Sequence, residues 1–350
     1  MERLGIEFIT NFQATLIIGA LLGCALGALA QVTRFCFRRA LIGEDKWQAG
    51  ATWAMALAVA TIGVQLGLSF ELFALEGHRL FPADLPLLAI VLGGVLFGTG
   101  AVLTRGCASR LTVLAAGGNL RAVVVLVTMA IVALATMKGV LAPLRTFAAS
   151  FTIASPTLAI PPAVVALALL IGAGLLVWKA RLAPTQIVLA ALLGALIPAA
   201  WVATGWALLD EFDPIPAESL SFTGPIADTL FWTVAATSIP PNFGISLFGG
   251  TLAGAALLTL IRKEFAWQGF EKPSQMGRYL FGGALMGFGG VLAGGCTIGA
   301  GLAGVPTLSV AAILALGSIA AGVVGAHKLL SGTSRESFGH STKLPQQPAE

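Results

Sequence analysis

Two glycine-rich stretches decide the fold: GGVLFGTGAVLTRGC at residues 93–107 and GGALMGFGGVLAGGC at residues 282–296. They align without a gap at an offset of 189 residues, and nine of their fifteen positions are identical. Each stretch is apolar, spaced with glycine and closed by Gly-Cys. Glycines at such spacings let helices in a membrane approach closely. The pair therefore predicts a membrane protein built from an internal repeat.

The composition of the whole chain supports a membrane location. Hydrophobic residues make up 57% of the 350 residues and charged residues only 10%, whereas a soluble domain has about 25% charged residues. So few charges cannot cover a water-facing surface, and one membrane domain is expected. The net charge of +4 is small and its basic residues cluster at segment ends, which argues against a nucleic-acid partner.

The apolar segments predict an all-α polytopic protein with about nine transmembrane helices, since a span needs about 20 apolar residues. They are residues 14–31, 50–70, 85–104, 120–138, 160–178, 186–209, 243–261, 277–294 and 307–327. Further apolar pieces are too short to cross and are expected to be re-entrant half-helices. These are residues 33–43, 107–117, 229–239 and 296–304.

Charge asymmetry orients the spans. With nine spans, the clusters that begin at Arg34, Lys179, Arg262 and Lys328 share one side, and Lys138 and Arg145 are exceptions. The positive-inside rule makes that side cytoplasmic in a bacterial inner membrane. We therefore expect a periplasmic N-terminus at 1–13, a single transport domain at 14–328 and a disordered cytoplasmic tail at 329–350. The repeat halves, about 14–145 and 186–328, then run in opposite directions, an architecture typical of secondary transporters.

Nothing in the chain predicts an enzyme. The four cysteines form no C-x-x-C pair, and only three histidines are present, so zinc-ligand spacing is absent. No hydrolase triad or phosphate-binding loop is recognisable. We expect no metal and no cofactor.

Two cysteines occupy matching positions at the start of predicted half-helices. Cys107 follows Gly106, and Cys296 follows Gly294 and Gly295. A half-helix N-terminus presents unpaired N–H groups and a positive dipole end, which together bind anions. Glycine lets a ligand approach the backbone, and a polarizable thiol suits a sulfur atom. We therefore interpret this region as a pathway for a small anion.

The other cysteines and the nearby arginines have competing interpretations. Cys36 begins another half-helix and joins the pathway on the same argument, whereas Cys24 lies within a span, where packing is favoured. Arg34, Arg105 and Arg110 would supply positive charge beside the path, as intramembrane charges usually have a function. The alternative for all three is that they only mark the cytoplasmic boundary.

The motifs that carry this interpretation resemble those of the YeeE/YedE family of sulfur-transport membrane proteins. They are TRFCF (33–37), TRGCASR (104–110), GGNLR (117–121) and LAGGCTIGAGLAGVPTLS (292–309). The resemblance covers about residues 14–328. It implies an hourglass-shaped helical protein in which cysteines at the constriction pass thiosulfate along by S–H···S contacts. That role falls on Cys107 and Cys296, and then on Cys36.

One motif departs from the family pattern, and the cargo stays open for that reason. Many members have Ala-Gly-Gly-Cys where this chain has Thr104-Arg105-Gly106-Cys107. The first hypothesis is a thiosulfate importer, or an importer of a related sulfur oxyanion. The second is a transporter of a selenium species or another small anion. The third is a membrane subunit that docks a sulfurtransferase, since the resemblance also implies a small cytoplasmic sulfur-carrier partner.

Overall fold

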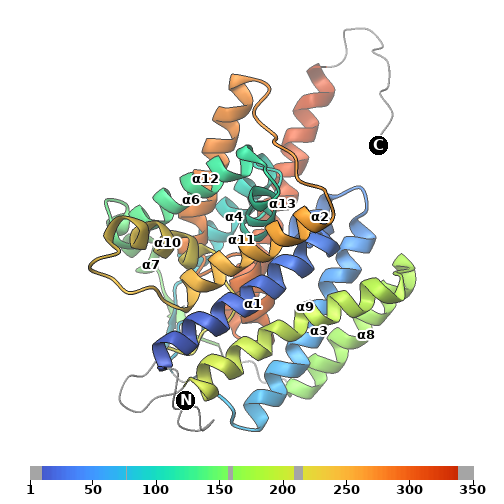
Figure 1. Cartoon of the computed structure of the whole chain (residues 1–350), viewed down its shortest axis with the longest axis vertical. Coiled ribbons are helices and arrows are strands. Elements are labelled where there is room, and N and C mark those ends of the chain that lie inside the picture. Colours follow the sequence, from blue (N-terminus) through green and yellow to red (C-terminus); the bar gives the residue numbers. More distant parts are fainter. Residues whose placement is uncertain (1–9, 76, 157–160, 209–215, 338–350) are drawn as a thin grey trace.

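The computed structural model describes residues 10–75, 77–156, 161–208 and 216–337, and these form an almost entirely helical bundle (Figure 1). Within them, nine helices are long and apolar enough to cross a membrane, which confirms the predicted spans. They are α1 (Asn11–Thr33), α3 (Lys46–Ser69), α4 (Leu87–Leu103), α6 (Leu120–Lys138), α8 (Pro162–Ala180), α9 (Pro184–Val202), α11 (Phe243–Ile261), α12 (Pro273–Leu292) and α13 (Val310–Ser337).

The short apolar pieces also form the expected short helices. They are α2 (Phe37–Ile42), α5 (Ala108–Ala116), α10 (Thr223–Ala235) and η3 (Thr297–Gly304). The last is a π-helix rather than an α-helix and runs into the 3₁₀ turn η4 (Val305–Thr307). Single π turns inside helices often occur at functional sites.

Several smaller elements were not foreseen from the sequence. They are α7 (Ala142–Ala149), the π turn η2 (Ala203–Ala207), and the two-stranded antiparallel pair β1 (Asp84–Leu85) and β2 (Ile153–Ala154). Helix α13 runs on to Ser337, so residues 329–337 are helical where the sequence predicted disorder. Residues 338–350 of that predicted tail, and 1–9 of the predicted N-terminal segment, lie outside the described residues.

Asparagines fix where two of the spans begin. The Asn119 side-chain oxygen accepts a hydrogen bond from the Ala122 N–H at 3.1 Å at the start of α6. Asn242 accepts from the Ile245 N–H at 2.9 Å at the start of α11. Such side chains satisfy backbone donors that the first helical turn leaves unpaired.

The crossing of α4 and α12 shows the repeat most directly. A Cβ on Gly93 would lie 2.7 Å from the carbonyl oxygen of Gly289, and one on Gly100 would lie 2.5 Å from that of Gly282. The two helices are therefore antiparallel and touch backbone to backbone. At the offset of 189 residues, Gly93 corresponds to Gly282 and Gly100 to Gly289. Applying the repeat to the contact between Gly93 and Gly289 therefore gives the contact between Gly282 and Gly100. The two copies run in opposite directions, so the repeat is an inverted one.

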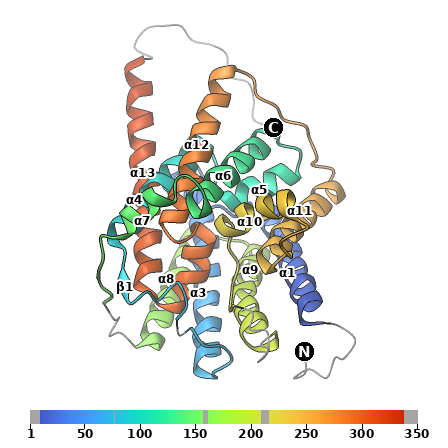
Figure 2. The same ribbon diagram turned by 90° about the vertical axis from the view of Figure 1, so that its left-hand side faces the viewer.

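The surrounding helices obey the same symmetry. Helix α4 packs against α13 as α12 packs against α6, and α1 packs against α11 as α9 packs against α3. Figure 2 shows α4, α12 and α13 grouped on one side of the molecule and α1, α9 and α11 on the other. Between the halves, α7 and α8 have no counterpart. Helix α8 packs against α3 and leaves Leu167, Ile171 and Leu175 exposed.

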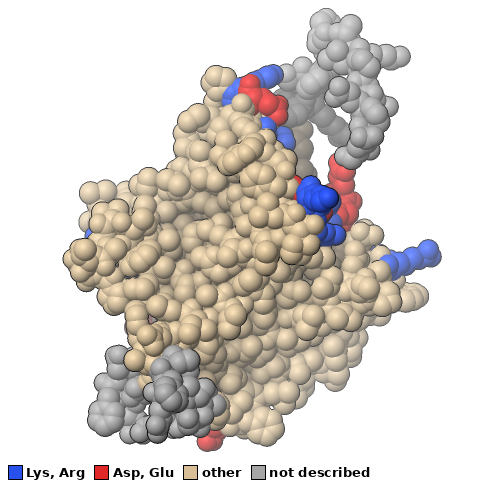
Figure 3. Space-filling view, in the orientation of Figure 1, with Lys and Arg blue, Asp and Glu red and all other residues tan. Residues whose placement is uncertain are grey.

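The visible surface fits a bilayer setting. Most of the face in Figure 3 is uncharged, and the Lys and Arg side chains gather toward its upper and right-hand edges. A broad uncharged surface with charged residues at its edges is the pattern of a protein that lies in lipid.

Candidate functional site

The same backbone turn occurs at three points in the chain. At each one a span ends in a left-handed residue, whose φ is 50° at Arg34, 60° at Arg105 and 74° at Gly294. A buried residue and then a buried cysteine follow at each point: Cys36, Cys107 and Cys296. The left-handed turn ends the span and redirects the chain, so that a short helix begins at the cysteine.

The two turns related by the repeat match in detail. The Thr104 N–H donates to Gly100 O at 3.0 Å, and the Ala293 N–H donates to Gly289 O at 2.9 Å. Each cysteine carbonyl then accepts the first bond of its short helix, from Leu111 or Ala300, at 2.9 Å. The Gly-Cys motif therefore marks the same turn and the same kind of helix start in both copies of the repeat.

The cysteines are N-cap residues, as the sequence predicted. Cys107 precedes α5, Cys36 precedes α2, and Cys296 precedes η3. The Sγ atom of Cys296 accepts a hydrogen bond from the Gly299 N–H at 3.4 Å. The thiol thus lies at the positive end of the short helix, where an anion would also be stabilised.

The turns come together in space. The Sγ atoms of Cys36 and Cys107 are 4.0 Å apart, and the Ser109 hydroxyl lies 3.4 Å from the Cys107 sulfur. The side chain of Thr297, the residue after Cys296, also interacts with the Cys107 thiol. All three cysteines are at least 94% buried. The starts of α2, α5 and η3 therefore form one buried cluster, which we call the thiol cluster.

Cys24 lies apart from this cluster. It sits within α1, where a Cβ added to Gly254 of α11 would collide with the Cys24 carbonyl oxygen. Its neighbourhood is a close helix–helix contact of small residues, as is usual in membranes. This placement favours the packing interpretation of Cys24.

Three arginines surround the thiol cluster in different ways. Arg34 and Arg105 are exposed at the left-handed turns, whereas most of Arg110 is buried and its Nη1 atom has no hydrogen-bond partner. The groups near Arg110 include the Cys36 and Cys107 thiols and two further arginines, Arg34 and Arg39. A buried guanidinium with an unpaired N–H is costly. An anion bound beside it would remove that cost.

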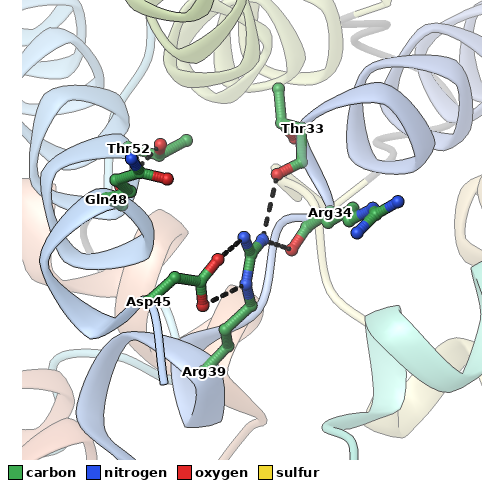
Figure 4. Close-up of polar contacts among 6 residues, drawn as sticks. All are labelled: Thr33, Arg34, Arg39, Asp45, Gln48 and Thr52. Carbon is green, nitrogen blue, oxygen red and sulfur yellow. Dashed lines mark hydrogen bonds and ion pairs between the residues drawn. The ribbon is translucent and has the colours of Figure 1, made fainter. Parts of the chain in front are cut away.

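A brace that sequence reasoning missed holds the turn before Cys36 (Figure 4). The Arg39 guanidinium pairs with Asp45, with 2.8 Å between Nε and Oδ1, and donates to the carbonyl oxygens of Arg34 and Thr33 at 3.1 and 3.5 Å. The hydrogen bond from Arg39 lowers the pKa of the Asp45 carboxyl. The only signal in the sequence is an acidic residue six positions after an arginine, which is too common to be informative.

The fold and the thiol cluster define a class: a polytopic membrane protein in which short helices begin at buried cysteines. Comparison with known proteins agrees with this class. The model of the sulphur-transport family matches residues 32–325, and the chain belongs to that family.

Two relatives carry a more specific name. The chain is 26% identical over 324 residues to the thiosulfate transporter TsuA of Escherichia coli, covering 82% of this chain and 86% of the relative. It is 27% identical over 318 residues to the thiosulfate transporter TsuA of Spirochaeta thermophila, covering 85% and 93%. Both alignments cover most of each chain.

Proposed function

We propose that the protein imports thiosulfate, or a related small sulfur oxyanion, through a pathway lined by cysteines. The observation that carries the proposal is the thiol cluster, with Cys36 and Cys107 in contact beside the start of η3. Family membership and the names of both relatives support the same cargo.

The proposed path uses helix ends for charge and thiols for the sulfur atom. N–H groups at the starts of η3 and α5 attract the anion, as helix N-termini do. Gly294, where an added Cβ would meet nothing within 4 Å, leaves the backbone open to it, and Gly295 and Gly106 directly precede the two repeated cysteines. The terminal sulfur of the cargo then exchanges S–H···S contacts with Cys296, Cys107 and Cys36 in turn. Arg105 and Arg34 receive the anion at the far side.

Direction follows from charge. The ends of α1, α8, α11 and α13 carry most of the basic residues, so we assign them to the cytoplasm of a bacterial inner membrane. The N-terminus is then periplasmic and the C-terminus cytoplasmic. Thiosulfate enters on the side of Gly294 and leaves on the side of Arg105.

The test is uptake by the purified chain alone in liposomes, measured with radiolabelled thiosulfate. We expect saturable uptake that unlabelled thiosulfate suppresses and equimolar sulfate does not. Suppression by selenite instead would assign the cargo to selenium. Absence of any uptake that depends on the chain would contradict the transport proposal.

A second candidate is sulfur relay to a cytoplasmic carrier protein. The exposed Arg34 and Arg105 lie beside buried thiols, and this pairing suits an acidic carrier that collects sulfur from a cysteine. Mass spectrometry of the purified protein tests the idea. A persulfide on Cys36 or Cys107, without uptake by the chain alone, would favour relay over transport.

A further inference from the structure

Two hollows on the side opposite Arg105 share a single arginine. The outer one, of about 350 Å³, is lined by residues that include His78, Arg79, Pro216 and Glu218. The inner one, of about 120 Å³, is lined by Arg79 together with Pro86, Gly294 and Ala300 among others. Arg79 therefore lines both hollows.

The inner hollow lies beside the turn that precedes Cys296. Gly294 is the left-handed residue two positions before Cys296, and the Ala300 N–H donates to the Cys296 carbonyl oxygen at 2.9 Å. The hollow thus lies against the first turn of η3. Its other lining residues, among those that the structure describes, are Leu, Pro, Ile, Ala and Gly, so Arg79 carries the only charge in that set. Its volume is several times the roughly 10–15 Å³ that one water needs, which leaves room for a small oxyanion.

The repeat shows why the arginine comes from elsewhere. Gly294 is the counterpart of Arg105, and both residues are exposed in left-handed turns. A Cβ on Gly294 would meet nothing within 4 Å. On one side, therefore, the turn itself carries a guanidinium. On the other, the turn is bare and the loop between α3 and β1 brings Arg79 to the hollow beside it.

Among the described residues that line the outer hollow, Arg79 is the one that carries a positive charge at neutral pH. Burial, with added repulsion from Arg79, lowers the pKa of His78 to about 4, so its imidazole is neutral at neutral pH. Burial also raises the pKa of Glu218, an effect that Arg79 opposes. Among the described residues, Asp228 is a further acidic group that Arg79 influences. Arg79 is itself exposed and open to an incoming ion.

We propose that Arg79 is the capture site for the small oxyanion, binding it at the mouth and passing it through the inner hollow to Cys296. This inference rests on the proposed transport function and adds to it a specific entry residue and an entry route. A guanidinium suits the site because it can donate two parallel N–H bonds to one oxyanion.

The experiment compares Arg79→Gln with Arg278→Gln in the liposome uptake assay. Arg278 is an exposed arginine at the start of α12, so its variant removes the same charge near the opposite end of that helix. Arg79→Gln should raise the half-saturating thiosulfate concentration about tenfold, the effect of losing about 1.4 kcal/mol of binding. The maximal rate should stay close to wild type, because the thiols are intact.

Two further measurements make the result specific. Arg79→Lys should recover part of the affinity, which shows that charge at this place matters rather than folding. The difference between wild type and Arg79→Gln should narrow at high salt, because an exposed charge is screened. An unchanged half-saturating concentration in Arg79→Gln, with wild-type uptake intact, would overturn the capture site alone. Lack of uptake by the wild-type chain would overturn the transport proposal instead.

Discussion

The two turns related by the inverted repeat have the same backbone conformation but different side chains. At α4–α5 the left-handed residue is Arg105 and an α-helix follows, with Arg110 buried one turn on. At α12–η3 the left-handed residue is Gly294, and the π-helix that follows consists mostly of small residues. The backbone is therefore symmetric, whereas the left-handed turn itself carries a guanidinium in only one of the two copies. In the other copy, Arg79 approaches the turn from the loop between α3 and β1.

The largest effect should come from removing either repeated thiol. Cys107→Ala and Cys296→Ala should each lower thiosulfate uptake at least about tenfold, because each deletes one partner for the cargo sulfur. Liposome uptake at matched protein content measures this. Cys24→Ala is the control and should retain most activity, since a packed span accepts a slightly smaller side chain. Equal mild losses at all three positions would leave only packing roles for the cysteines.

The next effect tests the symmetry of the scaffold. Gly100→Ala and Gly289→Ala occupy equivalent places in the α4–α12 crossing, where each new methyl would meet backbone atoms of the other helix. Both should destabilise the protein by a similar amount, about 1–3 kcal/mol. Thermal unfolding in detergent measures this against Gly172→Ala, a position on α8 with open space around it. If only one of the two variants lowered the melting temperature, the two equivalent glycine contacts would not contribute equally to stability.

A smaller effect is expected from the buried arginine on the charged side. Arg110→Gln keeps a hydrogen-bonding side chain but removes the charge beside Cys36 and Cys107. Uptake at low thiosulfate concentration should fall several-fold through weaker binding, since a neutral hydrogen bond contributes about 1 kcal/mol less than one to a charged group. The concentration dependence of uptake measures the change. A variant that binds thiosulfate like wild type would show that Arg110 only marks the membrane boundary.

The smallest effect should come from making the two turns alike. Arg105→Gly places glycine at a left-handed residue, a conformation that costs a residue with a side chain about 1–2 kcal/mol. Stability should therefore rise slightly while uptake falls a few-fold with the loss of the exposed charge. Melting temperature and uptake rate are measured on the same preparation. A loss of stability together with unchanged uptake would contradict both the cost of the left-handed conformation at Arg105 and the contribution of its charge to uptake.

The sequence was most informative where single segments decide the structure. Hydropathy alone locates the spans, because lipid requires long apolar helices, and Phe243–Ile261 falls at its predicted bounds. Gly-Cys after an apolar run likewise locates the starts of α5 and η3. The inverted repeat also follows from the aligned glycines, because those residues make the contact between α4 and α12.

Contacts between distant segments could not be predicted in the same way. Nothing local in TRFCF shows that Cys36 meets Cys107, since that contact depends on how α2 and α5 pack in three dimensions. The approach of Arg79 to Gly294 depends on tertiary structure in the same way. The brace from Arg39 to Asp45 spans only six residues, but it depends on the path of the chain between α2 and α3. The π-helix at Thr297–Gly304 is a local feature, but its residues also suit an α-helix apart from their glycines.

The central claim is that the cysteine thiols recognise the terminal sulfur atom of the cargo, and serine substitution tests this claim most directly. Cys296→Ser preserves the N-cap position, the N–H groups and the dipole of η3, and serine suits a helix start well. Only the polarizable sulfur is lost. We predict that Cys296→Ser loses thiosulfate uptake nearly as completely as Cys296→Ala in a side-by-side liposome assay. Uptake by Cys296→Ser at a rate near wild type would contradict the account and leave a general anion path in its place.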